Sequence, residues 1–135
     1  MIICWDIFYN LFFLFFTIII NRMSGGISFS KDHYWGKAGW AYRAVLDGIC
    51  DALLNTSEGK ELFDELSDEY SAARAMEYID VQEWPLEKQK IFLEAIEKTY
   101  SRYKQNGPEL IDPAFFPRFL EALGELNEMA KESIK

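Results

Sequence analysis

The segment 84-WPLEKQKIFLEAIEKTYSRYKQNGP-108 carries the clearest secondary-structure pattern of the chain. Pro85 suits the first turn of a helix, because the N–H that proline lacks would have no partner there. Gly107 followed by Pro108 is a typical helix end. The pattern predicts one long helix whose apolar stripe is formed by Leu86, Phe92, Leu93, Ile96, Tyr100 and Tyr103.

A second helix is predicted on the C-terminal side of this segment. Asp112 and Pro113 begin a turn, and Pro117 would kink a helix that continued through it. We therefore expect a single turn at 113–116 and a main helix from Pro117. Its inward residues are predicted to be Phe116, Phe119, Leu120, Leu123, Leu126 and Ala130, and its outward residues Glu121, Glu125, Glu128 and Lys131.

On the N-terminal side, residues 24–31 are rich in Gly and Ser and predict a linker. From Asp32 to about Asn55, apolar residues recur at steps of three and four, which indicates a core helix. Thr56 or Ser57 then caps a further helix. Ser67, followed by two acidic residues, predicts a break and a new helix that runs to about Asp80.

These elements together predict the fold class. No alternating pattern typical of a strand is long enough to compete with the helices. A chain of 135 residues, half of them apolar, suffices for one domain with its own core. We expect an all-α fold, a compact bundle of four to five helices formed by residues 24–135 as a single domain and preceded by a hydrophobic segment, residues 1–23.

The hydrophobic segment admits three interpretations. Ile2–Ile20 comprises 19 residues, about 28 Å as a helix, which is just enough to cross a hydrocarbon core. It would then be a membrane anchor, and the basic residues that follow it would place the body of the protein in the cytoplasm. Translation from Met23 would remove the segment altogether. A secretory signal fits poorly, because no Lys or Arg precedes the apolar run. The expected location is the cytoplasm, with or without an anchor.

Composition narrows the function. The chain has 22 acidic and 14 basic residues, a net charge of −8, which argues against nucleic-acid binding and favours a partner with a basic surface. One His and two Cys show no metal-ligand spacing, and no phosphate-binding or hydrolase motif is present. We therefore expect no metal, no cofactor and no enzymatic activity.

The acidic charge is concentrated in Ser57–Glu69, SEGKELFDELSDE, which has six carboxylates and one lysine. On a helix these acids form an arc opposite the apolar residues, which predicts a partner-binding surface with an aromatic anchor. The competing interpretations are a solvated face, or a face covered by the bases of the following helix. The predicted binding residues are Glu58, Glu61, Glu65, Asp68, Glu69, Tyr70 and Trp84.

The sequence thus predicts a small acidic helical binding protein without catalysis. Its most concrete form is an inhibitor or immunity-type partner that neutralises a basic protein such as a toxin or nuclease, since a concentrated acidic surface favours fast electrostatic capture. The alternative is a membrane-anchored helical module with a structural or scaffolding role.

Overall fold

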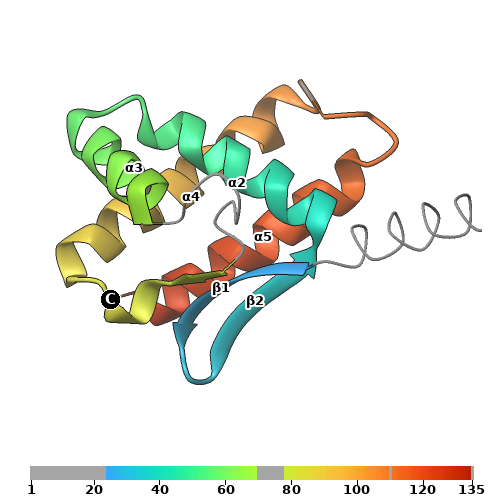
Figure 1. Ribbon diagram of the computed structural model, residues 1–135. Helices are drawn as coiled ribbons and strands as arrows, with labels where there is room; N and C mark the ends of the chain where they lie inside the picture. The colour runs from blue at the N-terminus through green and yellow to red at the C-terminus, as the bar shows by residue number, and fades with distance from the viewer. Residues whose placement is uncertain (1–23, 70–77, 110, 135) are drawn as a thin grey trace, which may run out of the picture.

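The computed structural model describes residues 24–69, 78–109 and 111–134, which form four α-helices and one three-stranded sheet (Figure 1). In chain order, the elements are β1 (Ser24–Ser30), β2 (His33–Ala38), α2 (Gly39–Leu53), α3 (Ser57–Glu69), β3 (Tyr78–Asp80), the 3-10 turn η1 (Val81–Glu83), α4 (Leu86–Asn106) and α5 (Phe116–Ser133).

The sheet has the order β2-β1-β3, with β1 antiparallel to β2 and parallel to β3. Ile27 lies in register with Trp35 on one side and Ile79 on the other, and all three side chains are buried. The Trp35 indole also donates a hydrogen bond of 3.0 Å to the carbonyl of Ala122. Trp35 therefore connects the inner face of the sheet to α5.

The sheet shows that the all-α prediction is wrong. The predicted linker at 24–31 contains β1, the start of the predicted helix at 32–55 is β2, and the end of the helix predicted to reach Asp80 is β3. The physical reason is that β1 pairs with residues about 50 positions away, so its stability comes from partners that a local pattern does not reveal. The fold is mixed, with helices beside a small sheet.

Two glycines in the hairpin make room for an aromatic ring, although in the sequence they resembled the glycines of a linker. A Cβ at Gly26 would lie 2.1 Å from the Tyr34 hydroxyl oxygen, and a Cβ at Gly36 would lie 2.8 Å from an edge carbon of the same ring. The Tyr34 ring therefore crosses the outer face of the sheet where these two residues have no side chain, and it stacks on Tyr78 with 6.3 Å between ring centroids.

The helices lie on the inner side of the sheet (Figure 1). Helices α2, α4 and α5 pack on one another, α2 and α5 contact the sheet, and α3 packs on α2 and α4. The predicted helix 84–108 is confirmed as α4, which ends at Gly107 with a positive φ of 80°. The helix predicted from Pro117 is confirmed as α5. The break predicted near Ser67 is wrong, because α3 continues through this residue.

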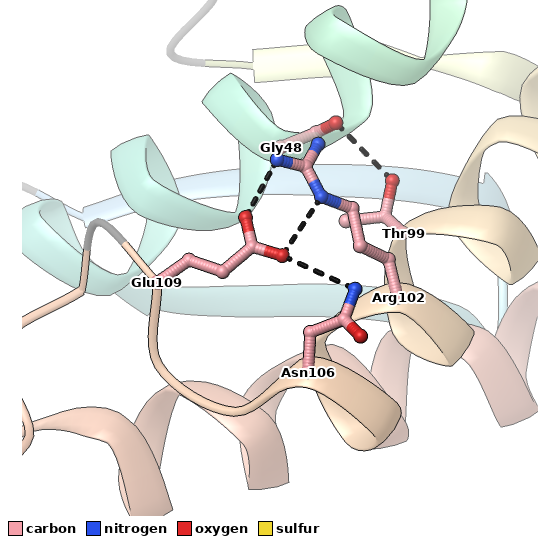
Figure 2. Close-up of polar contacts among 5 residues, drawn as sticks. All are labelled: Gly48, Thr99, Arg102, Asn106 and Glu109. Carbon is pink, nitrogen blue, oxygen red and sulfur yellow. Dashed lines mark hydrogen bonds and ion pairs between the residues drawn. The ribbon is translucent and has the colours of Figure 1, made fainter.

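The contact between α2 and α4 depends on a residue without a side chain. Thr99 of α4 donates its hydroxyl toward the carbonyl of Gly48 at 3.2 Å, as Figure 2 shows, and to that of Ala95 at 2.7 Å. A Cβ at Gly48 would lie 2.8 Å from Cγ2 of Thr99. Glycine therefore allows the two backbones to approach at this point.

A polar cluster holds the chain just after α4 (Figure 2). The Arg102 guanidinium donates to both carboxylate oxygens of Glu109, at 3.1 and 2.6 Å, and Asn106 donates to the same carboxylate at 3.5 Å. Glu109 has a positive φ of 47°, which is uncommon for a residue other than glycine. The hydrogen bond from Arg102 lowers the pKa of Glu109, so this cluster favours the ionised carboxylate.

The predicted hydrophobic segment 1–23 lies outside the described residues. Within the described ranges, none of the helices is both long enough and apolar enough to cross a bilayer.

Candidate functional site

The predicted acidic surface lies on α3, which begins after a side-chain cap. The Thr56 hydroxyl accepts a hydrogen bond of 3.0 Å from the backbone N–H of Gly59. Leu62 and Leu66 are buried against the rest of the molecule, so the opposite side of the helix faces outward. Glu58, Glu61 and Glu65 are exposed. Glu65 reaches Lys88, and Glu58 lines a small cavity together with residues of α4, so both lie on the edge of α3 that faces α4.

The bases of α4 cover only a small part of this surface. Lys88 forms an ion pair with Glu65, whereas Lys98 pairs with Glu94 of its own helix at 3.1 Å. Within the described part of the chain, no ion pair reaches Glu58 or Glu61. Glu58 and Glu61 are therefore accessible to a partner, and the role of this surface in binding stays a prediction.

Among the remaining predicted residues, Trp84 is the one whose side chain the structure describes. The side chains of Asp68 and Glu69, and all of Tyr70, lie outside the described residues. Trp84 is half-buried and packs edge-on against Phe92, with 5.3 Å between ring centroids. Part of its indole therefore packs on the core, and the rest is accessible to a partner.

A second acidic surface, which the sequence did not single out, runs along α5. We call it the α5 groove. It is an open hollow of about 650 Å³, and its lining is more apolar than polar. It is lined by one face of α5, together with Tyr100 of α4 and His33 of β2. The α5 residues that line it are Pro117, Leu120, Glu121, Gly124, Glu125, Glu128, Met129 and Glu132.

Gly124 and its neighbours shape the floor of the α5 groove. A Cβ at Gly124 would lie 3.3 Å from an edge carbon of the Tyr100 ring, so the glycine leaves room for this ring to stand close to α5. Leu120 and Met129 are only partly buried and supply apolar surface along the same helix. A partner that lies on this floor would therefore gain apolar contact as well as charge interactions.

The four glutamates of the α5 groove differ in their partners. Lys37 of β2 forms an ion pair with Glu125, and His33 Nε2 lies 3.9 Å from Glu132. In the described ranges, no cation is paired with Glu121 or Glu128. These two carboxylates are exposed and are available to bases from outside the molecule.

His33 lines this groove. Its Nδ1 lies 2.8 Å from the Ser30 hydroxyl oxygen, and its Nε2 lies 3.9 Å from a carboxylate oxygen of Glu132. Burial raises the pKa of the Cys50 thiol to about 11, with Asp47 and Asp51 adding to the shift, so this thiol is a poor nucleophile at neutral pH. The described residues contain no group of three His, Cys, Asp or Glu that could hold a metal ion.

The sequence predicted the exposed glutamates of the α5 groove but not its apolar lining. The outward positions of Glu121, Glu125 and Glu128 follow from helical spacing, and the exposed side chains agree with it. The apolar half could not be found in this way. Tyr100, Gly124 and His33 come from three elements that meet only in the folded protein.

Comparison with known proteins gives no relative for this chain: no protein-family model, no curated protein and no solved structure matches it.

Proposed function

We propose that this protein is a small acidic binding protein without catalysis that captures a protein partner with a basic surface. The most specific form of this proposal is an inhibitor or immunity-type protein in the cytoplasm that neutralises a cationic toxin or nuclease. The observation that supports the proposal best is the α5 groove, where Glu121 and Glu128, which have no cation partner among the described residues, lie beside partly buried apolar side chains of the same helix. Carboxylates alone give fast but weak encounter, whereas adjoining apolar area adds affinity.

The acidic surface of α3 remains a second candidate for the same function. Glu58 and Glu61 are exposed there without a partner among the described residues, and Glu65 is tied to Lys88. The cavity described beside Glu58 is about 180 Å³, smaller than the α5 groove. We therefore rank it behind the groove as the main contact.

Three double variants of equal charge separate these surfaces. Each changes two carboxylates to Lys and brings the net charge from −8 to −4. The pairs are Glu121/Glu128 in the α5 groove, Glu58/Glu61 on α3, and Asp47/Asp51 on α2 as a control. Binding is measured by biolayer interferometry to purified cationic nucleases and toxins, at low and high ionic strength, with acidic proteins of similar size as a negative control.

The proposal predicts at least one cationic ligand whose binding weakens about tenfold or more in the Glu121/Glu128 variant and far less in the control. Loss in the Glu58/Glu61 variant alone would move the interface to α3. Equal loss in all three variants would indicate an unspecific charge effect and contradict a defined site. Failure of the unmodified protein to bind any cationic protein in the panel would overturn the function itself.

The membrane-anchored alternative depends on Ile2–Ile20, which lie outside the described residues. Mass spectrometry of the N-terminus of the native protein, together with cell fractionation, tests it. A native chain that begins at Met23, or one found only in the soluble fraction, would remove this alternative.

A further inference from the structure

We infer that one end of this molecule rests on the surface of a lipid bilayer. We call it the aromatic end, and it is formed by Trp40, Arg43, Phe115 and Arg118. The two aromatic side chains enter the headgroup region, and the two arginines contact lipid phosphates. This inference concerns a surface other than the α5 groove and does not depend on the basic partner proposed above.

The first observation is a patch of exposed apolar side chains. Trp40 in the first turn of α2 and Phe115 just before α5 are 41% and 48% exposed, and their ring centroids lie 5.2 Å apart. Pro113, Ala114 and Pro117, which flank Phe115 in the chain, are exposed as well. Exposed apolar residues in such a run are uncommon unless they serve a contact. The patch therefore marks an interaction surface.

The chain holds Phe115 in this exposed position through an ordered turn. The backbone N–H of Phe115 donates a hydrogen bond of 2.9 Å to the carbonyl of Asp112, and the N–H of Ala114 donates one of 2.9 Å to the Asp112 carboxylate. The next residue, Phe116, is partly buried and packs against the core. The turn therefore directs one of two adjacent phenylalanines inward and the other outward.

An arginine accompanies each of the two exposed aromatic residues. Arg43 follows Trp40 by three positions in α2, and Arg118 follows Phe115 by three positions at the start of α5. This spacing places side chains on the same face of a helix. Both arginines are exposed, and within the described ranges no carboxylate lies at ion-pair distance from either. Aromatic and basic side chains together are typical of surfaces that contact lipid headgroups.

The second observation is the place where the apolar N-terminal segment joins the described chain. Ile20, its last apolar residue, precedes Ser24 by four positions, so their Cα atoms are at most about 14 Å apart in any conformation. Ser24 lies in register with Ala38, two residues before Trp40. The starts of β1, α2 and α5 lie at one end of the molecule, and α3 lies at the other (Figure 1). A bilayer that holds the segment is therefore close to Trp40 and Phe115.

A bilayer accounts for both observations, whereas the segment itself accounts for only one. With Leu11–Ile20 in the hydrocarbon region, the short connection keeps the aromatic end beside the headgroups. A segment that instead folded back over the patch would cover the apolar side chains but would bring little negative charge to Arg43 and Arg118, because Asp6 is its single acidic residue. The charges therefore favour a lipid surface as the occupant.

The test uses the chain of 135 residues bound to vesicles of phosphatidylcholine and phosphatidylserine, with part of the phosphatidylcholine brominated on its acyl chains. Bromine quenches Trp fluorescence at short range, and Trp5→Phe removes the Trp of the apolar segment. We expect the bound Trp5→Phe variant to be quenched, and Trp5→Phe/Trp40→Phe to lose at least about half of this quenching. Trp5→Phe/Trp84→Phe, which removes a partly exposed Trp elsewhere, is the matched control and should keep it.

Charge variants in the Trp5→Phe background test the arginines with the same readout. Arg43→Gln/Arg118→Gln should lower the quenching about twofold, because each arginine near the headgroups adds to the attraction. Lys60→Gln/Lys90→Gln removes the same charge from exposed positions of α3 and α4 and should leave the quenching unchanged. Equal losses in the two variants would overturn the role of the arginines.

Bound protein whose quenching does not change in Trp5→Phe/Trp40→Phe would overturn the contact, as would quenching that disappears with Trp84 instead. Full-length protein that stays free of the vesicles, or a native chain that begins at Met23, would overturn it as well. The proposed function is tested separately, by binding of cationic proteins without lipid, so failure of one leaves the other in place.

Discussion

Gly48 decides how closely α2 and α4 approach, because Thr99 occupies the space that a side chain would need. Thr99 cannot yield easily, since it is buried and its hydroxyl bonds to backbone carbonyls on both helices. Gly124 contrasts with it, because the nearest atom is the edge of the half-buried Tyr100 ring. Two glycines that look alike in the sequence therefore differ in how much they constrain the fold.

This contrast predicts opposite outcomes for the same substitution. Gly48→Ala should lower the free energy of unfolding by about 1 to 3 kcal/mol through overpacking. Gly124→Ala should leave it unchanged or raise it by up to about 1 kcal/mol, because Ala favours a helix more than Gly does. Urea unfolding followed by circular dichroism measures both. Equal destabilisation by the two variants would contradict the role assigned to Gly48.

Glu109 predicts a dependence on pH. Its pKa in the folded protein is lowered from 4.5 by the hydrogen bond from Arg102, so the native state favours the carboxylate. The resulting stability is present above about pH 4.5 and is lost as the pH falls through the lower native pKa. Glu109→Gln should therefore unfold at a slightly lower temperature than the unmodified protein at pH 7.

The difference in unfolding temperature between the two proteins should narrow below about pH 4.5 and close as the pH falls through the lowered native pKa of Glu109, because both side chains are then neutral. Calorimetry at several pH values follows it. A gap that stays constant down to pH 3 would show that the contribution of Glu109 does not depend on its charge.

At the scale of elements, the burial of side chains in the short strand β3 shows how the sheet contributes to the core. Ile79 is fully buried beside Ile27, whereas the adjacent Tyr78 points to the outer face, is 50% exposed and stacks on Tyr34. Residues that follow one another in a strand point to opposite faces. A helix through this segment would not separate them so sharply.

Ile79→Ala should therefore lower the free energy of unfolding by about 3 kcal/mol through loss of buried apolar volume. Tyr78→Ala should lower it by about 1 kcal/mol, because it removes mainly an exposed aromatic pair. Chemical denaturation compares the two variants. Similar losses of unfolding free energy in the two variants would contradict the pairing of β3 with β1.

At the scale of the whole molecule, excess negative charge acts on both function and stability. The net charge is −8, and exposed glutamates without partners among the described residues lie on α3 and in the α5 groove. Charges of one sign repel one another in the compact state and steer cations toward the surface. The charge on which the proposed capture of a basic partner depends therefore opposes folding.

We expect the unfolding temperature to rise with NaCl from about 10 to 150 mM, because salt screens this repulsion more than it weakens the exposed ion pairs. A variant that combines Glu61→Gln with Glu128→Gln should show a smaller rise. Differential scanning fluorimetry provides the measurement. A fall in the unfolding temperature of the unmodified protein with added salt would show that its ion pairs outweigh its repulsion.

The sequence by itself determined α4 and α5, the acidic charge of α3 and the outward glutamates of α5. These features depend on neighbours within four residues, on proline and glycine at helix ends, and on charge, all of which a local pattern contains. Only the tertiary structure decided that residues 24–38 form a hairpin and that Tyr78–Asp80 completes its sheet. It also brought His33, Tyr100 and Gly124 together around the α5 groove. The hairpin pairs residues only 3 to 14 positions apart, but its Gly- and Ser-rich first strand resembles a linker in composition. The pairing of β1 with β3 and the lining of the α5 groove depend on contacts between residues far apart in the chain, and no local periodicity specifies which partners meet.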